Sequence, residues 1–357
     1  MIYIVAFFGV LGVLVFVHEF GHFIVAKLVG VKVLKFSLGF GPRLIGKQIG
    51  ETEYVISAIP LGGYVKPLGE SSRDKVGARE RSRSFLHQSI PRRMAIVAAG
   101  PVANFLLAVF VFSLVFTIGV PQLMPVIGEV AAGYPAQAAG IKTGDRILRV
   151  NAVKINQWVD LPEVIAKSEG KKLQLTIKRG EALILVRVVP RPVVAKNIFG
   201  EEVKTYQIGI TPSGEFVKKQ EPAYKAVGMG VSQGWFFVKL TIVSIVKVIK
   251  GVVPAKQAFG GPVLIAQIAG KQAQEGLLNL VFFTAVLSVN LCVLNLFPIP
   301  ILDGGHLLFL GVESIIGRPL SVKKMEVAQQ IGLILILLLM ALAFYNDIMR
   351  LIPPGAR

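Results

Sequence analysis

The sequence predicts a polytopic α-helical membrane protein with a membrane-associated β-region and one inserted α+β domain. Hydrophobic residues make up 53% of the 357, and the mean hydropathy is +0.65, which is high for a soluble globular protein. Four largely uncharged stretches approach or exceed the roughly 20 residues that a helix needs to cross a bilayer. These expected transmembrane segments are residues 1–26, 94–120, 276–302 and 327–347.

The first stretch contains the sequence HEFGH at residues 18–22 in otherwise apolar surroundings. Ionisable side chains are costly in a lipid-facing helix, so those that occur there usually serve a site. Positions i and i+4 share one helix face, which allows His18 and His22 to bind the same metal ion. Glu19 is placed to take a proton from a water at that metal. The alternative is that the two histidines only pack inside a helix bundle.

The end of the third stretch offers the third ligand of such a site. A zinc hydrolase usually uses three protein ligands and keeps one position open for water. Asp303 follows 27 uncharged residues, and two nearby prolines break helical geometry, which is tolerated at membrane depth where the backbone lines a cavity. We therefore expect Asp303 to complete a site with His18 and His22. His306 is the rival ligand, and a helix cap is the alternative role of Asp303.

Three further residues of this stretch bear on the site. Asn290 and Asn295 are amides in an apolar segment, so they need hydrogen-bond partners. They could bind the substrate backbone or the oxyanion formed during attack, and plain helix–helix contacts would also satisfy them. The single cysteine, Cys292, excludes an internal disulfide and a multi-cysteine zinc site, and we expect it to be a small core residue.

Charge sets the expected orientation and partners. Residues 27–93 carry 13 Lys or Arg against 5 acidic residues, and residues 303–326 add Arg318, Lys323 and Lys324, so both segments are expected to be cytoplasmic with the two termini outside. Alternating apolar residues within 31–66 predict a small sheet or hairpin that partly dips into the membrane. The formal net charge of +18 favours anionic lipid headgroups as partners over nucleic acid, because no basic–aromatic nucleic-acid motif occurs.

The sequence pattern of residues 121–193 predicts a separate, extracytoplasmic domain. Short strands, two helices and glycine turns alternate there, and residues 135–147 match the bacterial signature P-A-x-x-A-G-I/L-x-x-G-D-x-I/L. The segment therefore resembles a PDZ domain, which binds peptides by strand addition, although its groove could also just pack against the membrane domain. In the following region, 194–275, we expect an amphipathic helix at the membrane interface, with a fifth span as the alternative.

Taken together, HEFGH, the pattern N-x-x-P-x-P-x-L-D-G at 295–304 and the PDZ segment resemble the site-2 protease family of intramembrane zinc metalloproteases. The likeness is to the bacterial regulator of sigma-E protease branch, here with room for one PDZ domain. It implies a Zn²⁺ ion on His18, His22 and Asp303, Glu19 as the catalytic base, and substrate handling by Asn290 and Asn295.

The same resemblance implies a place and a substrate class. A bacterial cytoplasmic membrane is the expected location, and the expected substrates are single-span membrane proteins, such as an anti-sigma factor or remnant signal peptides. Two other functions stay open from the sequence. The chain could be a membrane scaffold that uses its PDZ domain without catalysis, or a divalent-metal transporter.

Overall fold

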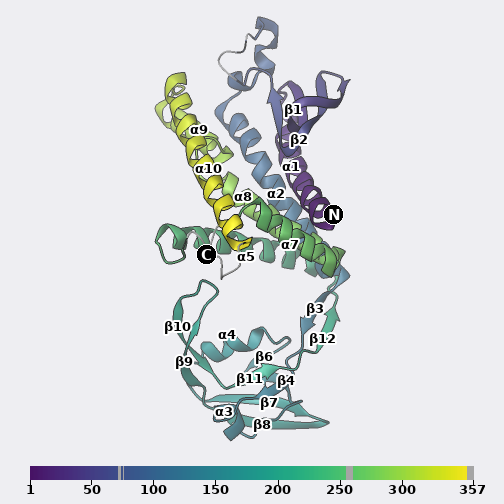
Figure 1. The fold of residues 1–357 in the computed structure, drawn as a ribbon, viewed down its shortest axis with the longest axis vertical. Coiled ribbons are helices and arrows are strands. Elements are labelled where there is room, and N and C mark those ends of the chain that lie inside the picture. The colour runs from purple at the N-terminus through teal and green to yellow at the C-terminus, as the bar shows by residue number, and fades with distance from the viewer. Residues whose placement is uncertain (71–73, 75, 255–259, 352–357) are drawn as a thin grey trace. The chain divides into compact units, whose positions relative to one another are not determined.

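The computed structural model describes residues 1–70, 74, 76–254 and 260–351 of the chain (Figure 1). It divides into two compact units. The helical unit comprises Met1–Val115 and Ala223–Arg357, and the inserted unit comprises Phe116–Pro222.

Long helices dominate the described part of the helical unit. They are α1 (Ile2–Leu28), α2 (Ile90–Ile118), α5 (Ala223–Ile249), α7 (Pro262–Glu275), α8 (Leu277–Asn295), α9 (Asp303–Ile316) and α10 (Val322–Leu351). Of these, α1, α2, α5, α8 and α10 are long and apolar enough to cross a membrane. The predicted class, a polytopic α-helical membrane protein, is therefore confirmed. Four of the five helices coincide with the four predicted stretches.

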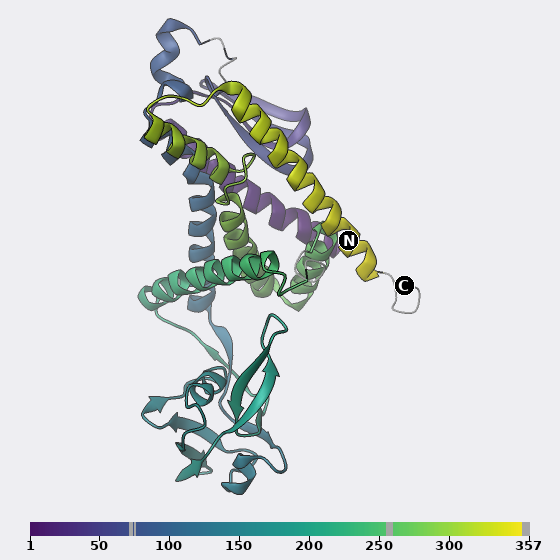
Figure 2. The ribbon, with the colours of Figure 1, turned by 90° about the vertical axis from the view of Figure 1, so that its left-hand side faces the viewer.

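The fifth candidate, α5, is the helix that the sequence analysis assigned to the membrane interface. Its buried residues, Ala226, Gly230, Gly234 and Val238, recur every four positions and so form one face. α5 runs across α2 in both views (Figures 1 and 2). Length and composition alone allow α5 to span, so the number of membrane crossings stays a prediction.

Small residues allow α1 and α2 to approach closely. A Cβ on Gly21 of α1 would lie 2.4 Å from the carbonyl oxygen of Ala99 and 2.7 Å from the Cβ of Ala103, both on α2. Contacts of this kind let helix backbones pack directly against each other, as is common between helices in membranes. The HEFGH segment of α1 is thereby pressed against α2.

The predicted small sheet is present as two long antiparallel strands, β1 (Val33–Ile49) and β2 (Thr52–Pro67). Each strand bends back on itself, so Phe36 pairs with Val65 on one side and with Tyr54 on the other. The first half of β1 thus lies between the two halves of β2. Among the described strands, the end of β2 pairs on one side only, which makes it an edge of the sheet. Two 3₁₀ turns, Ala78–Arg83 and Phe85–His87, lead from the sheet region to α2.

The inserted unit contains a four-stranded sheet in the order β6-β5-β7-β8. These strands are β5 (Arg146–Val150), β6 (Val153–Lys154), β7 (Leu173–Arg179) and β8 (Ala182–Val188). The helices α3 (Pro135–Ala138) and α4 (Asp160–Ala166) accompany it, and the alternating inward residues of β7 form much of the core. The short strands and the two helices expected within 121–193 are present.

Three strand pairs complete this unit and extend it beyond residue 193. β9 (Arg191–Lys196) pairs with β10 (Glu202–Gln207). β11 (Ile210–Pro212) pairs with β4 (Ile127–Val130), and β12 (Phe216–Lys219) pairs with β3 (Val120–Leu123). The chain therefore returns to the beginning of the unit before it enters α5, and the unit includes residues that we had expected after the inserted domain. Whether it is a PDZ domain stays a prediction.

The aspartate of the glycine–aspartate signature is buried in this unit. Asp145 accepts hydrogen bonds from Arg179 Nε at 2.7 Å, from Arg179 Nη2 at 2.8 Å and from the backbone N–H of Lys142 at 2.8 Å. Burial alone would raise the pKa of this carboxyl, but the bonds from Arg179 and Lys142 outweigh it and hold the pKa below its ordinary value. Asp145 thus joins the turn before β5 to the end of β7.

Candidate metal centre

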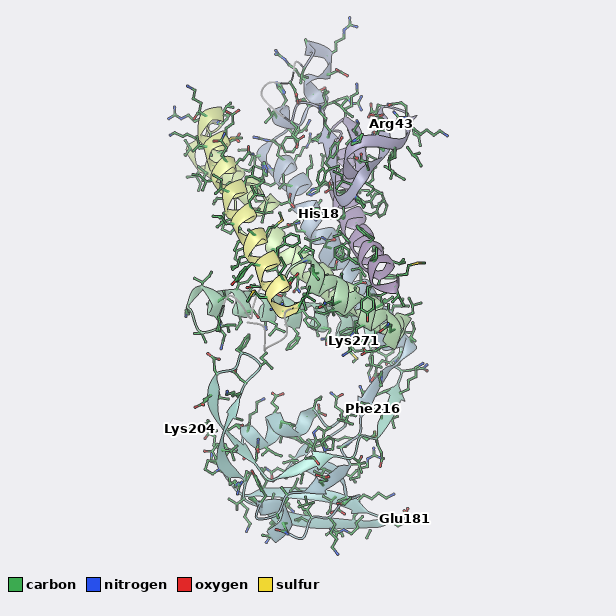
Figure 3. The ribbon with its side chains drawn as sticks, viewed as in Figure 1. His18, Arg43, Glu181, Lys204, Phe216 and Lys271 are labelled. Atoms are coloured by element: carbon green, nitrogen blue, oxygen red, sulfur yellow. The ribbon has the colours of Figure 1, made fainter. Side chains whose placement is uncertain are left out.

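The two histidines of α1 point their Nε2 atoms at each other. His18 and His22 lie one turn apart on the helix, and the two Nε2 atoms are 3.2 Å apart. His18 is 9% exposed and lies within the helical unit (Figure 3). Two ring nitrogens at this distance cannot both carry a proton without crowding. The arrangement is typical of two imidazoles that share a cation.

Asp303 is brought to the same point from the far end of the chain. After α8 the backbone turns through 296–302, and Asp303 begins α9. Its Oδ2 lies 3.2 Å from His18 Nε2, and its Oδ1 lies 3.6 Å from His22 Nε2. A Cβ on Gly304 would lie 2.3 Å from the backbone of Leu296, so only a glycine allows α9 to start this close to the preceding turn.

These three side chains fit a zinc ion. Their donor atoms, two imidazole nitrogens and one carboxylate oxygen, all lie within 4.8 Å of one another. Ligands of a tetrahedral zinc with bonds of about 2.1 Å are separated by about 3.4 Å, which is close to the distances found between these donors. In addition, Asp303 Oδ2 is buried and accepts no hydrogen bond from the described residues, which leaves its lone pairs available.

α2 covers the other side of the two imidazoles. His22 Nδ1 lies 2.8 Å from the carbonyl oxygen of Ile96, and the side-chain amide of Asn104 lies 3.2 Å from His18 Nδ1. Between them, Gly100 leaves room for the rings, because a Cβ there would lie 2.3 Å from His22 Nε2. Both Nδ1 atoms are thus engaged on α2, which leaves both Nε2 atoms facing Asp303.

Glu19 lies against the edge of the sheet. The backbone N–H of Val65 donates a hydrogen bond to its carboxylate, and a Cβ on Gly63 would lie 3.0 Å from its Cγ. The carboxylate is therefore held between α1 and β2, next to the histidines but outside the group of three donors. The role of Glu19 as proton acceptor stays a prediction.

The two asparagines of α8 have different surroundings. Asn295 Nδ2 lies 3.3 Å from His18 Nε2, so this amide borders the site. Asn290 instead accepts a hydrogen bond of 2.7 Å from Thr241 Oγ1 on α5, which is a helix–helix contact. The rival ligand His306 does not belong to the group of donors found among the described residues.

Sequence reasoning missed the contribution of α2. Asn104 is a fully buried polar residue in an apolar helix, so the argument applied to Asn290 and Asn295 would have singled it out as well. Gly100 and the carbonyl of Ile96 carry no comparable signal, because any residue supplies a carbonyl and glycine is common in membrane helices.

Two observations define the class of protein. One is a candidate metal site within a bundle of apolar helices, and the other is a match to a protein family. The chain matches the model of peptidase family M50 over residues 6–339, so it belongs to that family. It is a zinc-dependent metalloprotease and a multi-pass protein of a bacterial inner membrane.

Curated relatives cover nearly the whole chain. The regulator of sigma-E protease RseP of Escherichia coli (strain K12) is 33% identical, over 97% of this chain and 98% of the relative. RseP of Salmonella typhimurium (strain 14028s) is 34% identical over the same shares. A protein of Agrobacterium fabrum that is named as a zinc metalloprotease is 38% identical over 98% of this chain and 96% of its own length.

Proposed function

We propose that this protein hydrolyses peptide bonds within the membrane-spanning segment of single-span membrane proteins, with zinc on His18, His22 and Asp303 and with Glu19 as the base. The observation that carries this proposal is the convergence of three donor atoms within 4.8 Å, from both ends of the chain, beside a fourth ionisable side chain. Zinc, when bound, supplies Lewis acidity that makes water acidic enough to lose a proton near neutral pH.

Glu19 accepts that proton on its carboxylate and later delivers it to the leaving amine nitrogen. The bond from Val65 N–H orients the carboxylate without consuming both of its oxygens, since one N–H occupies a single lone pair. Asn295 offers its amide N–H₂ at the same place and can donate to the substrate carbonyl oxygen as negative charge develops on it.

The edge of the sheet gives the substrate a backbone partner. A helical substrate hides its carbonyls in its own hydrogen bonds, so the segment to be cut must unwind. Residues 63–67 of β2 form a sheet edge that also contacts Glu19, and an unwound segment paired there would regain its lost bonds. Strand pairing would therefore present the scissile bond to the base.

The inserted unit and the substrates are assigned on resemblance. We propose that Phe116–Pro222 contains one PDZ domain on the extracytoplasmic side, with N- and C-termini also outside, and that α5 lies at the membrane interface. The match of residues 135–147 to the bacterial signature supports the assignment of a PDZ domain. From the family resemblance, a membrane-bound anti-sigma factor is one expected substrate class, and remnant signal peptides are the other.

The test is cleavage of a single-span test substrate by purified protein in detergent, with bound zinc measured in the same samples. Wild type should cleave and Glu19→Gln should not, while both retain zinc. His18→Ala should lose both. Equal cleavage by wild type and Glu19→Gln would contradict the assignment of the base. Zinc retained by His18→Ala would contradict the assignment of the ligands.

A further inference from the structure

One face of α2 is built around the two imidazoles. Ile96, Gly100 and Asn104 are spaced by four residues, so they lie above one another on the same face of the helix. Ile96 supplies a carbonyl oxygen to His22 Nδ1, Gly100 supplies space, and Asn104 places its side-chain amide against His18 Nδ1. Ile96 acts through its backbone carbonyl and Gly100 through its lack of a side chain. Only Asn104 acts through a side chain.

The chemistry of a metal-bound histidine decides which amide atom must face His18. An imidazole that binds a cation through Nε2 carries its proton on Nδ1, so the group opposite Nδ1 must accept a hydrogen bond. The Ile96 carbonyl meets this requirement for His22. At His18 only the side-chain oxygen of Asn104 meets it, because the amide nitrogen is a donor and would require Nε2 to carry the proton instead.

The surroundings of Asn104 agree with this orientation. As the amide is placed, Nδ2 faces His18 Nδ1, and the buried Oδ1 has no hydrogen-bond partner among the described residues. The oxygen and nitrogen of an asparagine amide are assigned from hydrogen bonding, and the reversed amide gives Oδ1 the His18 N–H as its donor. Asn104 is 0% exposed, so no solvent water competes for this bond.

On these grounds, and resting on the zinc site proposed above, we propose that Asn104 is a positioning residue of the metal centre. Its side-chain oxygen accepts the Nδ1 proton of His18, which keeps His18 Nε2 unprotonated and aimed at the metal. Asn104 does not touch substrate or metal. Its effect is on the affinity of the centre for zinc and on the geometry of the His18 ligand.

The test measures zinc affinity of the full-length protein by competition with a chelator, in wild type and five variants. Asn104→Leu removes both amide atoms at similar volume and should weaken zinc binding about 10- to 100-fold, as is typical for loss of such a partner. Asn104→Asp keeps an acceptor and removes the donor, so it should bind zinc at least as tightly as wild type. Asn104→Ala repeats the loss of the amide without the bulk of leucine.

Ser288→Ala is the matched control. Ser288 Oγ donates a 2.7 Å hydrogen bond to the backbone carbonyl of Asn104, so this variant loosens the contact between α8 and α2 without altering the amide. Its zinc affinity should stay within about twofold of wild type, since a single buried neutral hydrogen bond contributes only modestly. The visible spectrum of the cobalt-loaded protein should change in Asn104→Leu and stay unchanged in Ser288→Ala.

Several outcomes would overturn the proposal. Wild-type zinc affinity in Asn104→Leu or in Asn104→Ala would show that the amide does not act on the centre. Asn104→Asp binding as weakly as Asn104→Leu would show that the donor, not the acceptor, matters. Failure of the underlying zinc site is distinguished by His18→Ala, which would then bind zinc as wild type does.

Discussion

Gly100 on α2 leaves no room for a side chain against His22 on α1. A Cβ there would lie 2.3 Å from Nε2 of His22 and 2.8 Å from Cε1 of His18. We therefore expect Gly100→Ala to displace the imidazoles, to lose bound zinc and to lose proteolysis. Helix propensity alone predicts that Gly100→Ala stabilises the protein by about 1 kcal/mol, because alanine favours a helix over glycine. The clash with the imidazoles predicts a loss of stability instead. Zinc per protein and the thermal midpoint of the variant decide the question.

Gly12→Ala is the control for this substitution, because a Cβ on Gly12 of α1 meets no atom within 4 Å. It should keep wild-type zinc content and activity. Full zinc content in Gly100→Ala would mean that α2 can move away from the rings without cost.

The two asparagines of α8 should differ in their effect on catalysis. Asn295 borders His18, whereas the side-chain oxygen of Asn290 is already engaged by Thr241. Loss of a donor to a developing oxyanion typically lowers kcat about 10²- to 10³-fold, so Asn295→Ala should do this with little loss of zinc. Asn290→Ala should mainly lower thermal stability, as Thr241→Val should. Equal loss of kcat in Asn290→Ala and Asn295→Ala would contradict this division of roles.

The sequence indicated those residues of the site that a pattern of neighbouring residues singles out, namely His18, His22 and Asp303. Helical spacing alone puts His18 and His22 on one face of a helix. Asp303 stands out because it is an acidic residue at the end of an uncharged stretch whose helical geometry is interrupted by prolines. The contribution of α2 depends on which helix packs against α1, and neither Ile96 nor Gly100 differs from an ordinary residue of an apolar helix. Assignment of these residues to zinc binding and catalysis stays a prediction.

The fold was predictable to a similar degree. The length of the apolar stretches predicted the fold class and four of the five long helices. The alternation of apolar residues within 31–66 predicted the sheet of β1 and β2. The double pairing of Phe36 with Val65 and Tyr54 was not predictable, because strand period fixes faces but not neighbours. α5 is ambiguous for a physical reason. Its lysines indicate an interface, while its length and composition also allow a span.

A buried ion pair fastens the helix that carries Asp303. Arg93 at the beginning of α2 donates to both carboxylate oxygens of Glu313 on α9, at 3.1 Å and 2.6 Å, and both side chains are largely buried. Removal of one partner of a buried pair typically costs about 3–5 kcal/mol, because the other charge stays buried alone. Arg93→Leu and Glu313→Leu should each lower the thermal midpoint and, since α9 begins at Asp303, the zinc content.

The double variant Arg93→Leu with Glu313→Leu separates packing from charge. Replacement of a buried pair by apolar residues of similar volume is often close to neutral, so the double variant should regain most of the stability and zinc. Additive losses in the double variant would show that the pair itself, and not the unpaired charge, holds α9.

Low pH should weaken the inserted unit through Asp145. Burial is the largest single influence and raises the pKa of this carboxyl, but the bonds from Arg179 and Lys142 together outweigh it and hold the folded pKa below the ordinary value. A carboxyl with a depressed folded pKa stabilises the folded state above its unfolded pKa of about 3.9, and this contribution is lost as pH falls through the folded pKa. Hydrogen exchange of β7 in the full-length protein should therefore show a constant opening free energy from pH 7 to 5 and a fall below about pH 4.

Substitution of Asp145 should have its full effect at neutral pH and a smaller effect below about pH 4, where wild type loses the same contribution. Asp145→Asn leaves Arg179, whose side chain is 33% exposed, without its carboxylate partner. It should lower the opening free energy of β7 by roughly 2 kcal/mol at neutral pH, as is typical for hydrogen bonds to a charged group, with a flatter pH profile than wild type. Glu163→Gln is the control, because Glu163 pairs with Lys167 on the surface, where an ion pair contributes about 0–1 kcal/mol. A fall in stability below pH 4 of the same size in Asp145→Asn as in wild type would assign it to other carboxyl groups. The ion pair of the buried Asp145 with Arg179 would then not be what makes this unit sensitive to acid.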